Sequence, residues 1–166
     1  MKLFTEREIR ATAIFLPLAL LVNILGGPSA NSRLNVSLRE KNGLSYNIEA
    51  SYTPYNDCGL AAIYFSSDHS NADHCRELID RELDALRRTK LTPRQLSMAK
   101  RQFLAQMAIS MESNEGYMLG AGKSFLVHDD IDTMEDVYKK VATVTADRIA
   151  EAAEEVFSDM STLIYK

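Results

Sequence analysis

The run from Leu38 to Ile48, Leu-Arg-Glu-Lys-Asn-Gly-Leu-Ser-Tyr-Asn-Ile, constrains the fold of this chain more than any other stretch. Gly43 suits the left-handed conformation that ends a helix without a Cβ penalty. Beyond it, apolar and polar residues alternate over 44–52, which is the period of a half-buried strand. The pattern predicts a helix that ends at Gly43 and a strand that follows directly, with Tyr46 on its apolar face. A cation, Arg39, then lies seven residues before this phenol.

Capping residues and hydrophobic periodicity predict the other elements. Glycines at 116, 120 and 122 lower the helix propensity of the segment 113–128. Such glycines indicate close packing of the backbone against a neighbour, and the alternative is a functional hinge. We expect helices over 29–41, 71–88 (capped by Ser70 or Asn71) and 113–128, a helix of about 20 residues from Thr92, two short helices opened by Thr133 and Thr145, and strands over 44–53, 59–66 and 161–166. A turn over 54–57 makes the first two strands an antiparallel hairpin.

The N-terminal segment allows two interpretations. Thr5 and Glu8 have the spacing of a capping box, and a helix from there would run to Leu25 with Pro17 in its interior. Alternatively the helix starts near Pro17, which then lies in the first turn, and we prefer this start. The apolar run over 11–25 is too short for a membrane span, and acidic residues precede it, unlike in a signal peptide. We therefore expect a helix that is buried on most sides.

The order of these elements predicts the α+β class, with helices packed on one face of a mainly antiparallel sheet. The strand over 59–66 has apolar residues on both faces, so we expect it to be central. Three strands make a narrow sheet, which predicts an exposed edge that a partner or a second copy covers.

Length and composition narrow the function. The 166 residues form one domain, 1–166, and the net charge of −4 argues against a nucleic-acid partner. We expect no membrane association. Cys58 and Cys75 have neither metal nor redox spacing, so we interpret them as small, partly buried residues. Two cysteines fit a reducing compartment slightly better, and we expect a cytoplasmic location.

A series of motifs resembles a known family. The chain reads Asn-Ile-Leu-Gly-Gly from Asn23, Ser-Arg-Leu from Ser32, Leu-Arg-Glu-Lys-Asn-Gly-Leu-Ser-Tyr from Leu38, and Leu-Thr-Pro-Arg-Gln-Leu from Leu91. This order is similar to the C-terminal domain of the M16 zinc peptidases, the pitrilysin and mitochondrial-processing-peptidase family. The resemblance covers 18–165. It implies an M16-like domain that lacks its first strands and is a fragment of a longer protein.

The resemblance also implies that the zinc ion belongs to another half of the protein. M16 peptidases bind zinc through His-x-x-Glu-His on a helix, and the motif's glutamate activates water. The histidines of this chain, His69, His74 and His128, do not stand in that pattern. We therefore expect no metal or cofactor in this chain and zinc in a partner half.

In the family, an Arg and a Tyr at this spacing reach toward the zinc site, hold the substrate backbone and steady the oxyanion. The resemblance assigns these roles to Arg39 and Tyr46, whose donors suit that chemistry. Two structural alternatives stay open. The ring of Tyr46 could be core, and Arg39 could form an ordinary surface ion pair with Glu40 or Asp57.

We therefore expect the non-zinc-binding C-terminal portion of an M16 zinc metallopeptidase, which contributes substrate binding and oxyanion stabilisation to peptide-bond hydrolysis but is inactive alone. Its expected partners are a peptide or unfolded protein, a zinc-bearing M16 half, and a second copy through the sheet edge. One alternative is a catalytically silent M16-like subunit with a structural or interaction role. A weaker one is an unrelated α+β interaction module.

Overall fold

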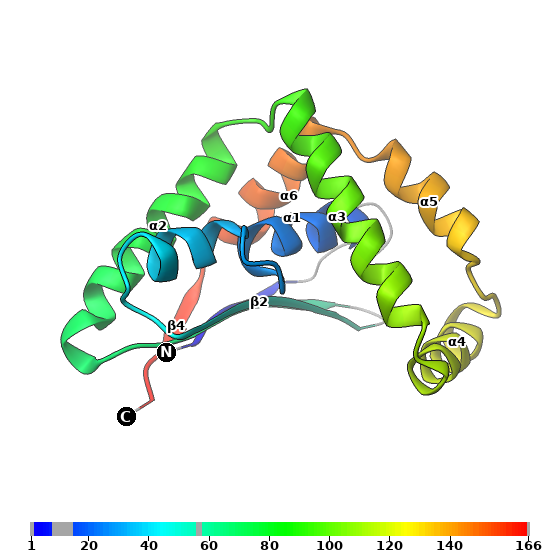
Figure 1. Cartoon of the computed structure of the whole chain (residues 1–166), viewed down its shortest axis with the longest axis horizontal. Helices are drawn as coiled ribbons and strands as arrows, with labels where there is room; N and C mark the ends of the chain where they lie inside the picture. Colours follow the sequence, from blue (N-terminus) through cyan, green and yellow to red (C-terminus); the bar gives the residue numbers. More distant parts are fainter. Residues whose placement is uncertain (1, 8–14, 56–57, 166) are drawn as a thin grey trace.

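The protein is an α+β domain in which helices cover one face of an antiparallel sheet (Figure 1). The computed structural model describes residues 2–7, 15–55 and 58–165. In these ranges the sheet has four strands in the order β2-β3-β1-β4. The predicted fold class is confirmed.

The elements follow one another with short connections. They are β1 (Lys2–Arg7), α1 (Phe15–Gly26), the π-helix η1 (Asn35–Glu40), β2 (Asn47–Pro54), β3 (Gly59–Ser66), the 3₁₀ turn η2 (His69–Asn71), α2 (Ala72–Arg88), α3 (Pro93–Met111), α4 (Asn114–His128), α5 (Met134–Thr143), α6 (Ala146–Phe157) and β4 (Ser161–Leu163).

Strands β2 and β3 form the predicted hairpin. Their register pairs Asn47 with Ser66 at one end and Pro54 with Gly59 at the other. The N–H of Tyr55 donates to the carbonyl oxygen of Cys58 over 2.9 Å and closes the turn, and residues 56–57 of that turn lie outside the described ranges. Strand β3 lies between β2 and β1, so its predicted central position is confirmed.

The prediction of a helix that starts at Thr5 is wrong for the residues of this segment that the structure describes. Residues Lys2–Arg7 form β1, which runs antiparallel to both β3 and β4; Glu8 of the supposed capping box lies outside the described residues. A capping box contributes a few local hydrogen bonds, whereas all six residues of β1 pair with β3, from Lys2 opposite Tyr64 to Arg7 opposite Gly59. The sheet therefore gains a strand ahead of the first helix, where the sequence indicated none.

Helix α1 is the centre of the hydrophobic core. It begins at Phe15, so the preferred start near Pro17 is confirmed. Its fully buried leucines, Leu18, Leu20, Leu21 and Leu25, lie between the sheet and the other helices. Helix α1 contacts β2 on one side and α6 and α3 on the others, as expected for a helix that is buried on most sides. Within the described ranges, no helix combines the length and the apolar character that crossing a bilayer requires.

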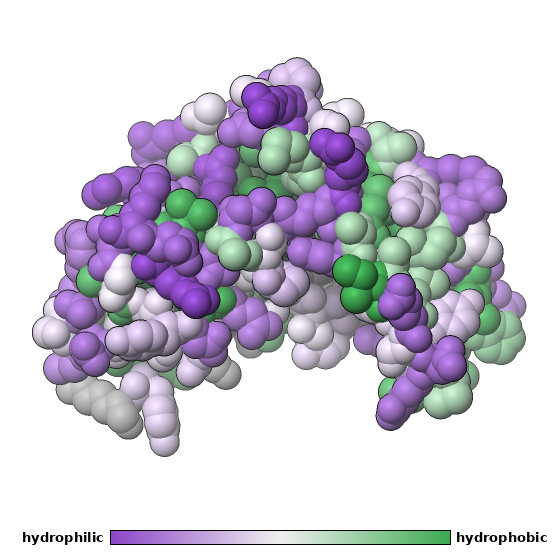
Figure 2. Space-filling view, in the orientation of Figure 1, coloured by the Kyte–Doolittle hydropathy of each residue, from purple (hydrophilic) through white to green (hydrophobic). Residues whose placement is uncertain are grey.

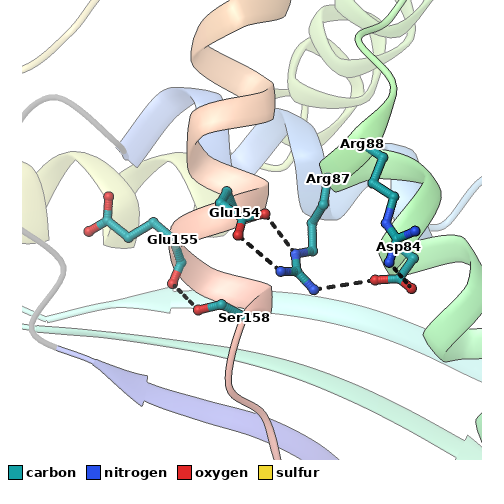
Figure 3. A network of polar contacts seen from close by, with 6 residues as sticks. All are labelled: Asp84, Arg87, Arg88, Glu154, Glu155 and Ser158. Carbon is teal, nitrogen blue, oxygen red and sulfur yellow. Dashed lines mark hydrogen bonds and ion pairs between the residues drawn. The ribbon is translucent and has the colours of Figure 1, made fainter.

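An ion-pair network joins α2 to α6 at the edge of this core (Figure 3). The guanidinium of Arg87 donates to both carboxylate oxygens of Glu154, over 2.9 and 3.0 Å, and to Asp84 over 3.3 Å. The hydrogen bond from Arg87 lowers the pKa of Glu154 and, in return, raises the pKa of Arg87. The bidentate geometry fixes the angle between two helices that the apolar core also holds together.

Helices α3, α4 and α5 extend away from the sheet (Figure 1). The predicted helix starts at Thr92 and Thr133 are confirmed, since each of these residues forms a capping box, at the start of α3 and of α5 respectively. Asn71, in contrast, precedes α2 without a side-chain cap. Exposed apolar side chains gather over this end of the molecule (Figure 2), and on α4 they are Tyr117, Met118, Leu119, Phe125 and Leu126.

The α4 glycines at 120 and 122 do not pack closely within this chain. A Cβ added at either position would meet no atom within 4 Å. The close-packing interpretation is therefore wrong for these two glycines among the described residues, and the hinge interpretation stays a prediction.

We expect Gly26→Ala to destabilise the domain by about 1–3 kcal/mol, the usual cost of overpacking. A Cβ at Gly26 would stand 2.8 Å from both the Cβ and the backbone nitrogen of Ala50 on β2, so α1 or β2 must shift. Urea denaturation measures the change. The matched control is Gly122→Ala in the open interior of α4, which we expect to stabilise by about 0.5–1 kcal/mol. Equal effects of the two substitutions would contradict the close contact.

Candidate functional site

The segment that carries Arg39 is a π-helix. In η1 the hydrogen bonds span five residues, so that the N–H of Lys41 donates to the carbonyl oxygen of Val36 over 3.0 Å. Such wider turns are rare and occur frequently at functional sites. The sequence predicted an ordinary helix over 29–41, and its periodicity gave no signal of the extra residue in the turn.

Three hydrogen bonds hold the end of this π-helix. Gly43 has a φ of 61°, which confirms the predicted left-handed stop, and its N–H donates to the carbonyl oxygen of Arg39 over 3.0 Å. The N–H of Leu44 donates to Leu38 over 2.9 Å. The side-chain amide of Asn42 donates to the carbonyl oxygen of Ser37 over 2.7 Å. The turn between helix and strand is therefore fixed at its backbone.

One face of this segment is anchored in the core. Leu34 and Leu38 are fully buried, and Ser37 is buried beside them. Arg39 and Glu40 lie on the other face, each with 58% of its side chain exposed. The buried leucines hold the backbone, so the guanidinium of Arg39 extends from a fixed base into solvent.

The predicted placement of Tyr46 on the apolar face of the strand is wrong. Its side chain is 90% exposed, while the preceding Ser45, predicted on the polar face, is 2% exposed. The hydroxyl of Ser45 donates to the carbonyl oxygen of Ser66 over 2.6 Å and lies 3.1 Å from that of Asn47. Because β2 begins only at Asn47, the alternation of its faces does not extend back to Tyr46.

Arg39 and Tyr46 are thus two exposed donors on either side of a fixed turn. The exposure of Tyr46 rules out a core role for its ring within this chain. The ion pair proposed for Arg39 is present, with 3.8 Å between its Nε and Oε1 of Glu40, whereas Asp57 lies outside the described residues. That the two side chains reach toward a common zinc site stays a prediction.

The described residues do not fit a zinc ion. Among them, no three His, Cys, Asp or Glu side chains gather closely enough to hold a metal. His69 lies in η2, and His74 pairs with Glu77 at 3.6 Å along α2. A catalytic zinc needs three protein ligands and an open position. No step of the chemistry is therefore assigned to a metal on this chain.

The buried thiol of Cys75 and the partly buried phenol of Tyr52 do not resemble activated nucleophiles. Burial raises the pKa of Cys75, which keeps it a thiol near neutral pH. Burial also raises the pKa of Tyr52, whose ring lies 5.7 Å from that of Phe15. Arg39 and Tyr46 are among the exposed polar side chains of this turn, together with Glu40 and Lys41.

The fold and the site define an α+β domain that presents hydrogen-bond donors but, in the ranges described, no metal-binding cluster. The family model of the peptidase M16 inactive domain matches residues 8–103, which is more than half of the chain. The chain belongs to this family, as its motifs indicated.

Relatives and solved structures agree with this family. The chain is 29% identical over 142 residues to the uncharacterized zinc protease YmxG of Bacillus subtilis, and 27% identical over 142 residues to an uncharacterized zinc protease of Streptomyces coelicolor. These matches cover 86% of this chain but 34% and 31% of the relatives, so the chain spans about a third of their length.

Two crystal structures show the same fold. A peptidase M16 inactive domain from Pseudomonas fluorescens matches with a TM-score of 0.76 and 22% identity, over 93% of this chain and 37% of that one. An inactive peptidase domain from Bordetella parapertussis matches with a TM-score of 0.75 and 15% identity, over 96% and 87% of the two chains.

We expect Gly43→Ala to destabilise the domain by about 1–2 kcal/mol, since alanine pays a Cβ penalty in the left-handed region. No atom lies within 4 Å of the added Cβ, so the cost is conformational and not steric. Gly43→Asn should cost less, because asparagine tolerates this conformation. Thermal denaturation of both variants measures the difference. Equal losses for alanine and asparagine would mean that the backbone conformation is not the cause.

Proposed function

We propose that this chain is the zinc-free portion of an M16 zinc peptidase and that it completes the active site of a zinc-bearing half. The single observation that carries the proposal is the pair of exposed donors, Arg39 and Tyr46, on the fixed turn of an M16 inactive domain. The relatives carry the name zinc protease, and this supports the proposal. We also propose that residues 1–166 form a single domain within a longer protein.

In this proposal Arg39 binds the substrate backbone. Its guanidinium is always charged, and its planar fork can donate two parallel hydrogen bonds to a peptide carbonyl or a carboxylate. The fixed backbone at Leu38 and Gly43 limits the entropy that the side chain loses when it binds. The substrate is a peptide or an unfolded segment of a protein.

Tyr46 stabilises the oxyanion in the same proposal. A phenol donates one hydrogen bond, and a donor held at the place where negative charge develops stabilises the transition state more than the ground state. The exposure of Tyr46 in this chain leaves its hydroxyl available to an added half. The hydroxyl then acts in a dry site only when the two halves close around the substrate.

A second candidate function is that of a catalytically silent partner subunit. The specific observation in its favour is the pair of Arg39 with Glu40, at 3.8 Å and more than half exposed on both sides. Such surface pairs contribute less than about 1 kcal/mol and are common without any function. In that case the chain supports a partner through its surfaces, and the two donors are ordinary surface residues.

A cytoplasmic location is also part of the proposal. Cys75 is buried, and it is not joined to Cys58 by a disulfide, which fits a reducing compartment.

We expect that this chain alone does not cleave peptides, and that it raises cleavage by a zinc-bearing M16 half carrying His-x-x-Glu-His. In the reconstituted enzyme, Tyr46→Phe should lower kcat by about 10²–10³-fold, the usual effect of losing one oxyanion donor. Arg39→Ala, which removes a contact with the substrate backbone, should lower kcat/KM. Steady-state cleavage of a fluorogenic peptide measures this.

Matched controls are Arg76→Ala and Tyr165→Phe. Arg76 has 52% of its side chain exposed and pairs with Asp80 at 3.9 Å, and Tyr165 is 91% exposed. Both controls should leave kcat and kcat/KM unchanged. If Arg39→Ala and Tyr46→Phe behave like the controls, the silent-subunit function is favoured. Robust zinc-dependent hydrolysis by this chain alone would refute the first proposal.

We further propose that a second copy pairs along the β2 edge, because β2 has a strand neighbour on one side only within the described part of the sheet.

Light scattering at increasing protein concentration should show a dimer. Ser51→Lys, on the exposed face of β2, should weaken it by placing like charges at the edge. Ser66→Lys on the central β3 is the control. A monomer at all concentrations would exclude this pairing.

A further inference from the structure

A cavity of about 310 Å³ opens between the end of α1, the segment before η1 and the first half of α3. This volume is at the lower end of the range of small-molecule pockets. Neither Arg39 nor Tyr46 lines it, so the cavity is separate from the site described above. Helix α3 passes close to α1 here (Figure 1). The amide of Asn23 donates to Gln106 over 2.6 Å.

Arg33 and Arg101 line this cavity, and no Asp or Glu is among the lining residues that the structure describes, although the chain has a net charge of −4. Arg33 pairs loosely with Glu82, at 3.6 Å, from outside the cavity. In the ranges that the structure describes, Arg101 makes no ion pair. The positive charge at this cavity is therefore only partly neutralised, which favours an anion.

Apolar side chains form much of the remaining wall. Ile24, Leu91 and Met98 lie along it. The amide of Gln95 is held in the capping box of α3, where its oxygen accepts from Thr92. The cationic groups and the apolar wall meet in one small space. A ligand that fits both carries a negative charge on an apolar body.

We infer that this cavity binds an organic carboxylate with an apolar substituent. The guanidinium forks of Arg33 and Arg101 match the two oxygens of a carboxylate, and the apolar wall covers the substituent. The carboxylate belongs either to the C-terminal residue of a peptide or to a free small acid. This inference does not rest on the proposed peptidase role, because none of its residues belongs to the Arg39 and Tyr46 turn.

Calorimetric titration of the 166-residue chain tests the site. The probes are N-acetyl-leucine, hexanoate and an acetylated tripeptide that ends in leucine, with N-acetyl-leucinamide and the tripeptide amide as neutral counterparts. We expect the acids to bind in a saturable way and the amides at least about tenfold more weakly, the scale of a lost charge-assisted hydrogen bond. The affinity should fall as salt rises.

Substitutions locate the site. Arg33→Gln and Arg101→Gln should each weaken acid binding about tenfold. Arg94→Gln, on α3 but outside the cavity, should leave it unchanged. Glu82→Gln should tighten binding, because it removes the carboxylate that competes for Arg33. Circular dichroism melts verify that each variant is folded.

Each outcome decides the inference or identifies the ligand. Binding of the peptide acid alone assigns the cavity to peptide C-termini, and binding of hexanoate and N-acetyl-leucine alone assigns it to free acids. Both results support a carboxylate site. Equal binding of acids and amides, no saturable binding of any acid, or the same loss with Arg94→Gln as with Arg101→Gln would overturn it.

Discussion

The close contact between α1 and β2 is the constraint on which the rest of the structure depends. At Gly26 the helix approaches so near to Ala50 that a single methyl group would not fit. Because the leucines of α1 are fully buried and the helix contacts β2 directly, it fixes the position of the sheet's edge strand. That strand in turn sets where the preceding turn leaves the sheet, and so where Arg39 and Tyr46 stand.

The turn between η1 and β2 combines a fixed backbone with exposed side chains. Leu34 and Leu38 anchor the π-helix in the core, and the hydroxyl of Ser45 ties the start of β2 to Ser66 at the end of β3. Preorganised groups of this kind can act on a ligand at a low entropic cost. The arrangement suits a domain that supplies contacts to chemistry performed elsewhere, which is the role we propose within the M16 family.

The helices divide into a buried part and an exposed part. Helices α1, α2 and α6 carry most of the buried apolar residues of the helices, and the Arg87–Glu154 pair joins two of them. Helices α3 and α4 have no buried residues in the described ranges, and they present apolar side chains to solvent. Regions with few buried contacts open most easily and often carry binding surfaces. The cavity beside Arg101 lies where these two parts meet.

The sequence by itself determined the local features. The helix starts at Thr92 and Thr133 and the left-handed Gly43 depend on atoms within a few residues, so the local pattern was sufficient to predict them. Only the tertiary structure decided that residues 2–7 form a strand, because their partners on β3 lie more than fifty residues further along the chain. It also turned Tyr46 outward, since the hydrogen bond of Ser45 to Ser66 fixes where the alternation of β2 begins. Residues 2–7, Lys-Leu-Phe-Thr-Glu-Arg, show no strict alternation of apolar and polar residues that would indicate a strand.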